Sequence, residues 1–108
     1  MSKMFNPPHP GHIVKSVMES LGLSARKFAA NLGVSPATVT RLVKGEIAIS
    51  PEMAVKLSAA IPGPDAAMWL RMQATYSAWQ AEQRIDVSYI QRYSIDETAA
   101  QNLLNQDS

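Results

Sequence analysis

Apolar residues recur at a spacing of three or four in five successive stretches of the chain, which places them on one side of an α-helix. The stretches cover residues 10–22, 24–33, 35–45, 50–61 and 65–83. Four begin with Ser or Asp, which accept hydrogen bonds from the free amides at a helix start. Three end at Gly, which adopts the left-handed conformation of a helix end. The pattern predicts an all-α fold of four short helices and a longer fifth.

The two ends of the chain do not follow this helical pattern. Residues 6–8, Asn-Pro-Pro, cannot start a helix, so they predict an extended arm. Beyond the fifth stretch, Ile85, Val87 and Tyr89 alternate as in a short strand, and residues 94–97 match a capping box before a weak helix. The chain is expected to comprise an arm, a helical domain and a tail whose structure the pattern leaves open, at residues 1–9, 10–84 and 85–108.

Composition limits the functions that are possible. The 108 residues fit one domain, and 46% of them are hydrophobic, which is enough to form a core. The absence of cysteine excludes disulfides, zinc knuckles and a thiol nucleophile, and it favours a reducing compartment. The first residues lack the apolar stretch of a signal peptide, and no apolar run reaches the roughly 20 residues of a membrane span. We therefore expect a cytoplasmic protein with no membrane contact.

Charge is distributed unevenly along the chain, although the net charge is only +1. Residues 1–44 hold six basic residues and one acidic residue, whereas residues 45–108 hold four basic and eight acidic residues. This separation favours a polyanion bound by the first part and a different partner on the second, but ordinary solvated helices also show an excess of this size. Charge alone does not decide between these interpretations.

Residues 24–42 have the spacing of a helix-turn-helix. Ala29 is small enough for two helices to cross closely, and Gly33, four residues later, suits a turn that needs a positive φ. Val39 and Leu42 would then pack the second helix of the motif against the first. Any small α-domain contains such residues singly, and it is their combined spacing that indicates the motif.

The exposed side of this motif carries the candidate DNA-binding residues. The motif and the two residues after it hold four positive charges and no negative ones, as contact with phosphates requires. We expect Arg41 to bind guanine, and Ala37 and Thr38 to touch thymine methyl groups in the major groove. Arg26, Lys44 and the amides at the two helix starts would meet phosphates, unless these cations are merely solvated. The expected DNA-binding residues are Ser24, Arg26, Ser35, Pro36, Ala37, Thr38, Thr40, Arg41 and Lys44.

Five motifs give the chain a resemblance to a known family. They are His-Pro-Gly at 9–11, Ser-x-x-x-Phe-Ala-x-x-Leu-Gly-Val-Ser at 24–35, Thr-Val-Thr-Arg-Leu-Val-Lys-Gly at 38–45, Ser-Pro-Glu-Met-Ala-Val-Lys-Leu at 50–57 and Met-Trp-Leu at 68–70. In this order they resemble the HigA antitoxins of bacterial toxin–antitoxin operons, which are repressors of the Cro/C1 type.

The resemblance covers about residues 8–83 and implies a five-helix, lambda-repressor-like fold, a homodimer, and autorepression at a palindromic operator. It also implies neutralisation of HigB, an mRNA-cleaving toxin that resembles RelE. The chain departs from the Cro/C1 pattern at Ala25, where a phosphate-binding Gln is common, and its tail matches no family pattern. The last helix has more apolar residues than a small core needs. We place the expected dimer contact there, at Trp69, Met72, Tyr76 and Trp79.

Other functions have less support from the residues. His9 and His12 are three residues apart, but neither a third ligand nor a positioned carboxylate accompanies them. We expect exposed imidazoles at a helix start, and no catalytic residue, metal, cofactor or small-molecule substrate. A stand-alone repressor and a protein-interaction module that has lost DNA binding remain alternatives. A basic toxin would contact acidic residues after Lys44, away from the DNA-binding helix, or else residues 1–9.

Overall fold

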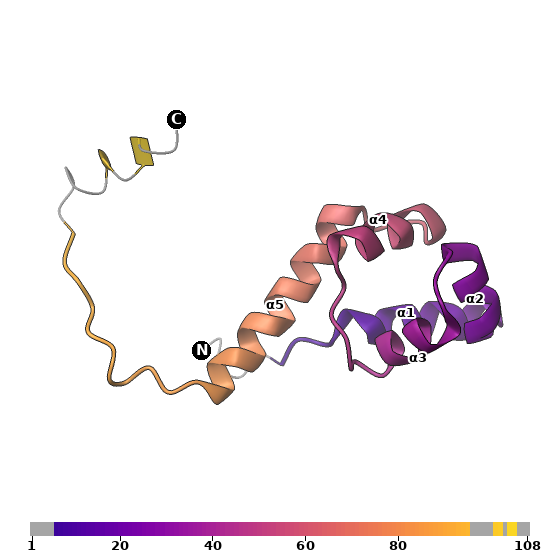
Figure 1. Ribbon diagram of the computed structural model, residues 1–108, viewed down its shortest axis with the longest axis horizontal. Coiled ribbons are helices and arrows are strands. Elements are labelled where there is room, and N and C mark those ends of the chain that lie inside the picture. The colour runs from indigo at the N-terminus through magenta and orange to yellow at the C-terminus, as the bar shows by residue number, and fades with distance from the viewer. Residues whose placement is uncertain (1–5, 96–100, 103, 106–108) are drawn as a thin grey trace.

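The described residues of the computed structural model, 6–95, 101–102 and 104–105, form a small helical body, a projecting helix and a tail (Figure 1). The predicted all-α, five-helix fold is confirmed for this part of the chain. No helix in it is both long and apolar enough to cross a membrane. The helices are α1 (Pro10–Leu21), α2 (Ala25–Leu32), α3 (Pro36–Val43), α4 (Pro51–Ala60) and α5 (Ala66–Arg84).

All five helices begin with a side chain that accepts a hydrogen bond from a free backbone amide. The hydroxyl oxygens of Ser24, Ser35 and Ser50 accept from the N–H three residues ahead at 3.1, 3.2 and 3.1 Å, and the Asp65 carboxylate does so at 2.8 Å. Each such cap contributes about 1 kcal/mol to stability. The residues immediately before each helix therefore set its start, as the pattern predicts.

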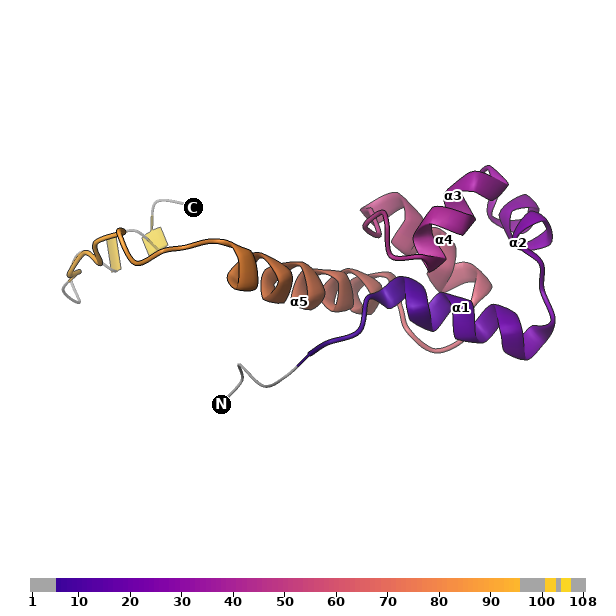
Figure 2. The ribbon, with the colours of Figure 1, turned by 90° about the horizontal axis from the view of Figure 1, so that it is seen from below.

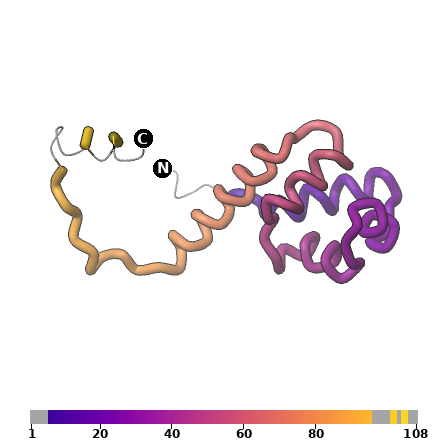
Figure 3. The backbone as a smooth tube through the Cα atoms, turned by 45° about the horizontal axis from the view of Figure 1, so that its top comes forward, coloured from indigo at the N-terminus to yellow at the C-terminus, as the bar shows by residue number. Residues whose placement is uncertain are grey.

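Two helix pairs and one crossing helix build the core. α2 packs against α3 and α4 against α5, while α1 contacts both α3 and α5 (Figure 3). Val14, Leu42, Leu57 and Trp69 come from four different helices and have no exposed surface. Burial of one such side chain contributes about 1.5–3 kcal/mol, so these residues hold the helices together.

Only the first half of α5 belongs to the body. Trp69 and Gln73 are its buried residues, and the side-chain oxygen of Gln73 accepts a hydrogen bond from the Ile49 N–H at 2.8 Å. The second half extends away from the other helices (Figure 2). Trp79 and Ala81 are half-buried there and their neighbours are exposed. One helix thus serves both as a core element and as a free surface.

The described part of the tail contains no strand, so the strand suggested by the alternation at residues 85–89 is wrong. The backbone turns instead, because the Ser88 N–H donates to the Asp86 carboxylate and the Ile90 N–H to the Val87 carbonyl, both at 3.0 Å. Alternation alone does not make a strand, which needs a neighbour to pair its backbone groups. Residues 101–102 and 104–105 are helical, and the predicted capping box at 94–97 lies partly outside the described residues.

His9 ties the end of the arm to the body. Its Nδ1 accepts a hydrogen bond from the Gly11 N–H at 2.9 Å and so caps α1, and its ring packs edge-on against Tyr76 with 4.9 Å between ring centroids. The side chain is only 3% exposed, which corrects the expectation of an exposed imidazole at this position. Pro7 is also buried, so the extended arm packs against the body at Pro7 and His9.

Gly11 allows the backbones of α1 and α3 to approach closely. A Cβ atom at this position would overlap the carbonyl oxygen of Leu42 in α3. A backbone carbonyl cannot rotate away as a flexible side chain can. Beside this contact Gly45 follows α3 with a positive φ of 77°, next to the rings of His9 and His12. The position of α3 therefore depends on the absence of a side chain at residue 11.

We expect Gly11→Ala to lower the free energy of unfolding by about 1–3 kcal/mol or more, because the added methyl group forces α1 away from α3. The measurement is urea denaturation followed by helical circular dichroism. Ser16→Ala, on the exposed side of the same helix, is the control and should change stability by no more than about 0.5 kcal/mol. Equal denaturation midpoints for both variants would contradict the close approach.

Stability should fall in mild acid because of His9. Burial and the neighbouring His12 lower the pKa of His9 from its ordinary value of 6.5, while a hydrogen bond with the Ile47 backbone opposes this effect. The unfolded state then binds the proton more readily, so stability is retained above 6.5 and lost as the pH falls towards the folded-state pKa. The urea midpoint should decrease between about pH 7.5 and 5.0. His9→Asn should flatten this decrease, whereas an unchanged pH profile would exclude His9 as its source.

Candidate nucleic-acid interface

α2, the turn after it and α3 have the geometry predicted for a helix-turn-helix. Ala29 of α2 is fully buried in the core, and Gly33 begins the turn with a φ of 74°. The Val34 N–H donates to the Ala29 carbonyl at 3.0 Å, which holds the turn against the end of α2. Val39 and Leu42 are fully buried. Because these two residues point inward, the opposite side of α3 faces solvent.

The exposed side of α3 combines occupied hydroxyl groups with a free cation. The Ser35 hydroxyl accepts from the Thr38 N–H and lies 3.0 Å from the Thr38 hydroxyl, while the Thr40 hydroxyl donates to the Pro36 carbonyl at 3.0 Å. Thr38 and Thr40 are half-buried, and Arg41 is exposed. The guanidinium of Arg41 is therefore the side-chain donor best placed to reach a base in a groove.

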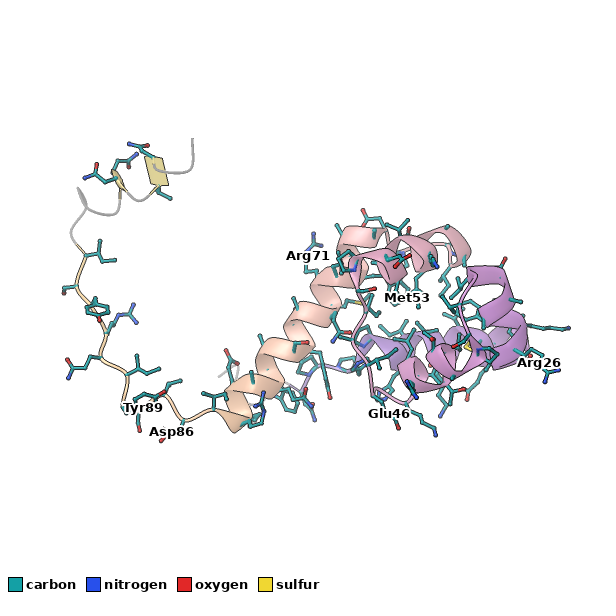
Figure 4. The ribbon with its side chains drawn as sticks, in the orientation of Figure 1. Arg26, Glu46, Met53, Arg71, Asp86 and Tyr89 are labelled. Atoms are coloured by element: carbon teal, nitrogen blue, oxygen red, sulfur yellow. The ribbon has the colours of Figure 1, made fainter. Side chains whose placement is uncertain are left out.

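The starts of α2 and α3 offer further hydrogen-bond donors. Pro36 has no N–H, so the exposed Ala37 presents the first free amide of α3. At the start of α2, the Ser24 oxygen is occupied by the Lys27 N–H, and its hydroxyl hydrogen stays available to a phosphate. Arg26 projects from the end of the body opposite α5 (Figure 4). Both helix starts can thus hold an anion.

Three exposed cations, on α2 and at the end of α3, are unpaired in the described part of the chain. Within residues 6–95, Arg26, Arg41 and Lys44 are exposed and form no ion pair. Their charges are therefore free to replace the counterions of a nucleic-acid backbone. Ala25 is half-buried against the core, and its methyl group gives no hydrogen bond to a phosphate. Phosphate contact at the start of α2 accordingly falls to Ser24 and Arg26.

Of the described acidic residues after Lys44, Glu46 lies beside α3. Glu46 directly follows this helix, and its N–H donates to the Arg41 carbonyl at 2.9 Å, at the edge of the body labelled in Figure 4. Glu52 lies in the first turn of α4, and the Asp65 carboxylate caps α5. The expectation that these acids lie apart from the DNA-binding helix is therefore wrong for Glu46. Position along the sequence did not predict position on the surface.

The four residues predicted for a dimer contact fall into two groups. Trp69 has no exposed surface, so its assignment to a dimer contact is wrong, and its indole N–H has no hydrogen-bond partner in the described residues. Met72, Tyr76 and Trp79 are half-buried, and the rings of Tyr76 and Trp79 lie 6.1 Å apart. Helical spacing places all four on one side of α5, but it does not reveal where along the helix the body ends.

Gln73 fixes the loop before α4 to α5, a role that the sequence pattern did not predict. Its side chain is buried, accepts from Ile49 in the loop before α4, and donates to the Ser77 hydroxyl at 3.0 Å. The sequence does contain one indication of this buried position, because Gln73 lies four residues after Trp69 and therefore on the same side of the helix. No group of three His, Asp or Glu residues that could hold a metal occurs in the described parts of the chain.

Known proteins resemble this chain in sequence. A family described as helix-turn-helix matches residues 14–64. The uncharacterised HTH-type transcriptional regulator YddM of Escherichia coli K12 is 42% identical over 90 residues, which cover 83% of this chain and 95% of YddM. The chain belongs to this helix-turn-helix family. The expectation that it is not an enzyme agrees with the family's transcription factors and antitoxins.

Two solved structures of this family resemble the fold. PA4674 of Pseudomonas aeruginosa, solved with its operator DNA, is 26% identical with a TM-score of 0.73 and covers 82% of this chain and 97% of its own. The antitoxin HigA of the same organism, solved with the higBA promoter, is 29% identical with a TM-score of 0.62 and covers 74% of this chain and 96% of its own. The resemblance to HigA-type antitoxins is therefore confirmed.

Proposed function

We propose that this chain is a DNA-binding antitoxin of the HigA type, which represses its own operon in the cytoplasm and neutralises a HigB-like, mRNA-cleaving toxin. The observation that carries the proposal is the exposed side of α3, where Arg41 and Lys44 are free of ion pairs in a helix-turn-helix. PA4674 and the Pseudomonas HigA support it, since both were solved with DNA of their operator or promoter.

The contacts to DNA divide into base-reading and positioning contacts. α3 enters the major groove, where Arg41 donates two hydrogen bonds to a guanine and the exposed Ala37 touches a thymine methyl group with Thr38 and Thr40 beside it. Phosphates are held at the two helix starts and at the end of α3. The phosphate contacts come from Ser24, Arg26, Ser35, the Pro36–Ala37 backbone and Lys44.

The antitoxin acts as a homodimer. One helix-turn-helix reads only a few base pairs, and Tyr76 and Trp79 on α5 are incompletely covered. A two-fold contact on Met72, Tyr76 and Trp79 covers this surface and presents two copies of α3 to DNA. The operator is then a palindrome whose half-sites are about 10 base pairs apart, or a multiple of that.

Arg41→Ala should weaken binding to the chain's own promoter by about 1–3 kcal/mol and leave binding to random DNA less affected, because Arg41 reads a base. Lys44→Ala should weaken both DNAs alike and reduce the salt slope by about one. Fluorescence anisotropy across a salt series measures both effects. Lys56→Ala, on α4, is the charge-matched control and should change neither. Equal losses from Arg41→Ala and Lys44→Ala on random DNA would refute base reading.

Co-expression with the reading frame next to the gene of this chain, which the proposal expects to encode a RelE-like toxin, tests the antitoxin function. The toxin should co-purify with the chain, and growth should be restored. Arg41→Ala should keep toxin binding while weakening promoter binding, because α3 serves DNA alone. Promoter binding without toxin binding would indicate a stand-alone repressor, and toxin binding without salt-dependent promoter binding would indicate a protein-interaction module. Either result contradicts the proposal.

A further inference from the structure

The tail after α5 carries apolar side chains that are largely exposed to solvent. Of the residues 85–95, six are apolar or aromatic, and all six are between 49% and 88% exposed. Segments that stay solvated are poor in aromatic and β-branched residues, so this composition is that of a segment that packs. The six residues are Ile85, Val87, Tyr89, Ile90, Tyr93 and Ile95.

The tail forms a hydrogen-bonded turn without a partner. The Asp86 carboxylate accepts from the Ser88 N–H, and the Val87 carbonyl accepts from the Ile90 N–H. The hydrogen bonds from Ser88 lower the pKa of Asp86. These bonds fix a turn directly after α5, which reduces the entropy that the tail loses on docking.

An apolar groove on the body has no occupant among the described residues. It has a volume of about 250 Å³, large enough for an isoleucine or tyrosine side chain, and it lies where the arm, α1 and α5 meet. Arg71 lies on its rim, and Met68 is 42% exposed beside it. The groove is otherwise lined by Pro7, Pro8, Ile13, Met72 and Thr75.

Helix geometry brings the groove and the tail together in the proposed dimer. The half of α5 that projects is centred near Trp79, its one large apolar side chain. If two copies of α5 pair antiparallel about a point between Ala78 and Trp79, Ile85 of one copy lies level with Met72 of the other, because residues equally far from that point are opposite each other. Asp86 then lies level with Arg71, so opposite charges also face each other at the rim.

We propose that the tail of each protomer docks in the groove of its partner, with Ile85 and Tyr89 on the apolar wall and Asp86 near Arg71. The proposal rests on the homodimer proposed above. Within one chain the rigid helix carries Ile85 about 20 Å from Met72, in the direction away from the groove. Docking between two protomers therefore covers both the apolar tail and the apolar groove, which stay exposed to water in a monomer.

Paired cysteines test the docking, because the natural chain has none. Differently tagged chains carrying Met68→Cys and Tyr89→Cys are co-expressed and oxidised, and mixed disulfide dimers are measured on a non-reducing gel. We expect at least tenfold more of this product than from the matched pair of Leu21→Cys and Tyr89→Cys, since Leu21 is 64% exposed at the far end of α1. A chain with both Met68→Cys and Tyr89→Cys should form covalent dimers, and an internal disulfide would overturn the proposal.

Sedimentation of the same chains separates failure of the docking from failure of the dimer. A dimer without the Met68–Tyr89 disulfide overturns the docking alone, whereas a monomer at micromolar concentration overturns both. Truncation after Arg84 should raise the labelling rate of the Met68→Cys thiol by a thiol-reactive dye at least tenfold. If this thiol reacts equally fast with and without the tail, and is shielded only when the toxin is present, the toxin is the occupant and the docking is wrong.

Discussion

The close contact between α1 and α3 at Gly11 is the constraint on which the rest of the structure depends. With no side chain at this position, the Leu42 carbonyl of α3 lies against the first turn of α1. The residue before that turn, His9, caps α1 and packs against Tyr76 of α5. The arm, the first helix, the proposed DNA-reading helix and the projecting helix therefore meet within a few residues. A shift at this point displaces α3 relative to α5.

This junction links the two surfaces on which a repressor of this kind depends. α3 carries the residues proposed to read DNA, and α5 carries those proposed to pair two copies. Gln73 reinforces the link, because its buried side chain binds the Ile49 backbone in the segment that follows α3. A dimer can present two copies of α3 at a fixed separation only if each is held rigidly to its own α5, and this geometry supplies that rigidity.

The starts of α2 and α3 are capped by uncharged polar side chains. Ser24, Ser35 and Ser50 each satisfy an amide of their own helix, and Asp65 does the same for α5. Carboxylates are thus absent from the starts of α2 and α3, where they would repel phosphates. Among the described residues, Arg41 and Lys44 also remain unpaired and available to phosphates. Helix capping and the proposed DNA binding are compatible because serine supplies an acceptor without a charge.

The sequence by itself determined the local structure. Serine or aspartate before four of the five helices, glycine after three of them, and the spacing of Ala29, Gly33 and Val39 predict the five helices and the helix-turn-helix, because caps, turns and helical periodicity are set by residues close together in the chain. The same spacing also predicts which side of α3 faces solvent. The candidate DNA-binding residues could therefore be named before the structure was known.

Only the tertiary structure decided what depends on distant residues. It shows that α5 leaves the body after Tyr76, which separates the buried Trp69 from the half-buried Trp79 although both share one side of the helix. It buries His9 against α5, and it places Glu46 beside α3. Periodicity gives the direction of a side chain around its helix, whereas burial is decided by which other helices lie there, and that information is spread over the whole chain.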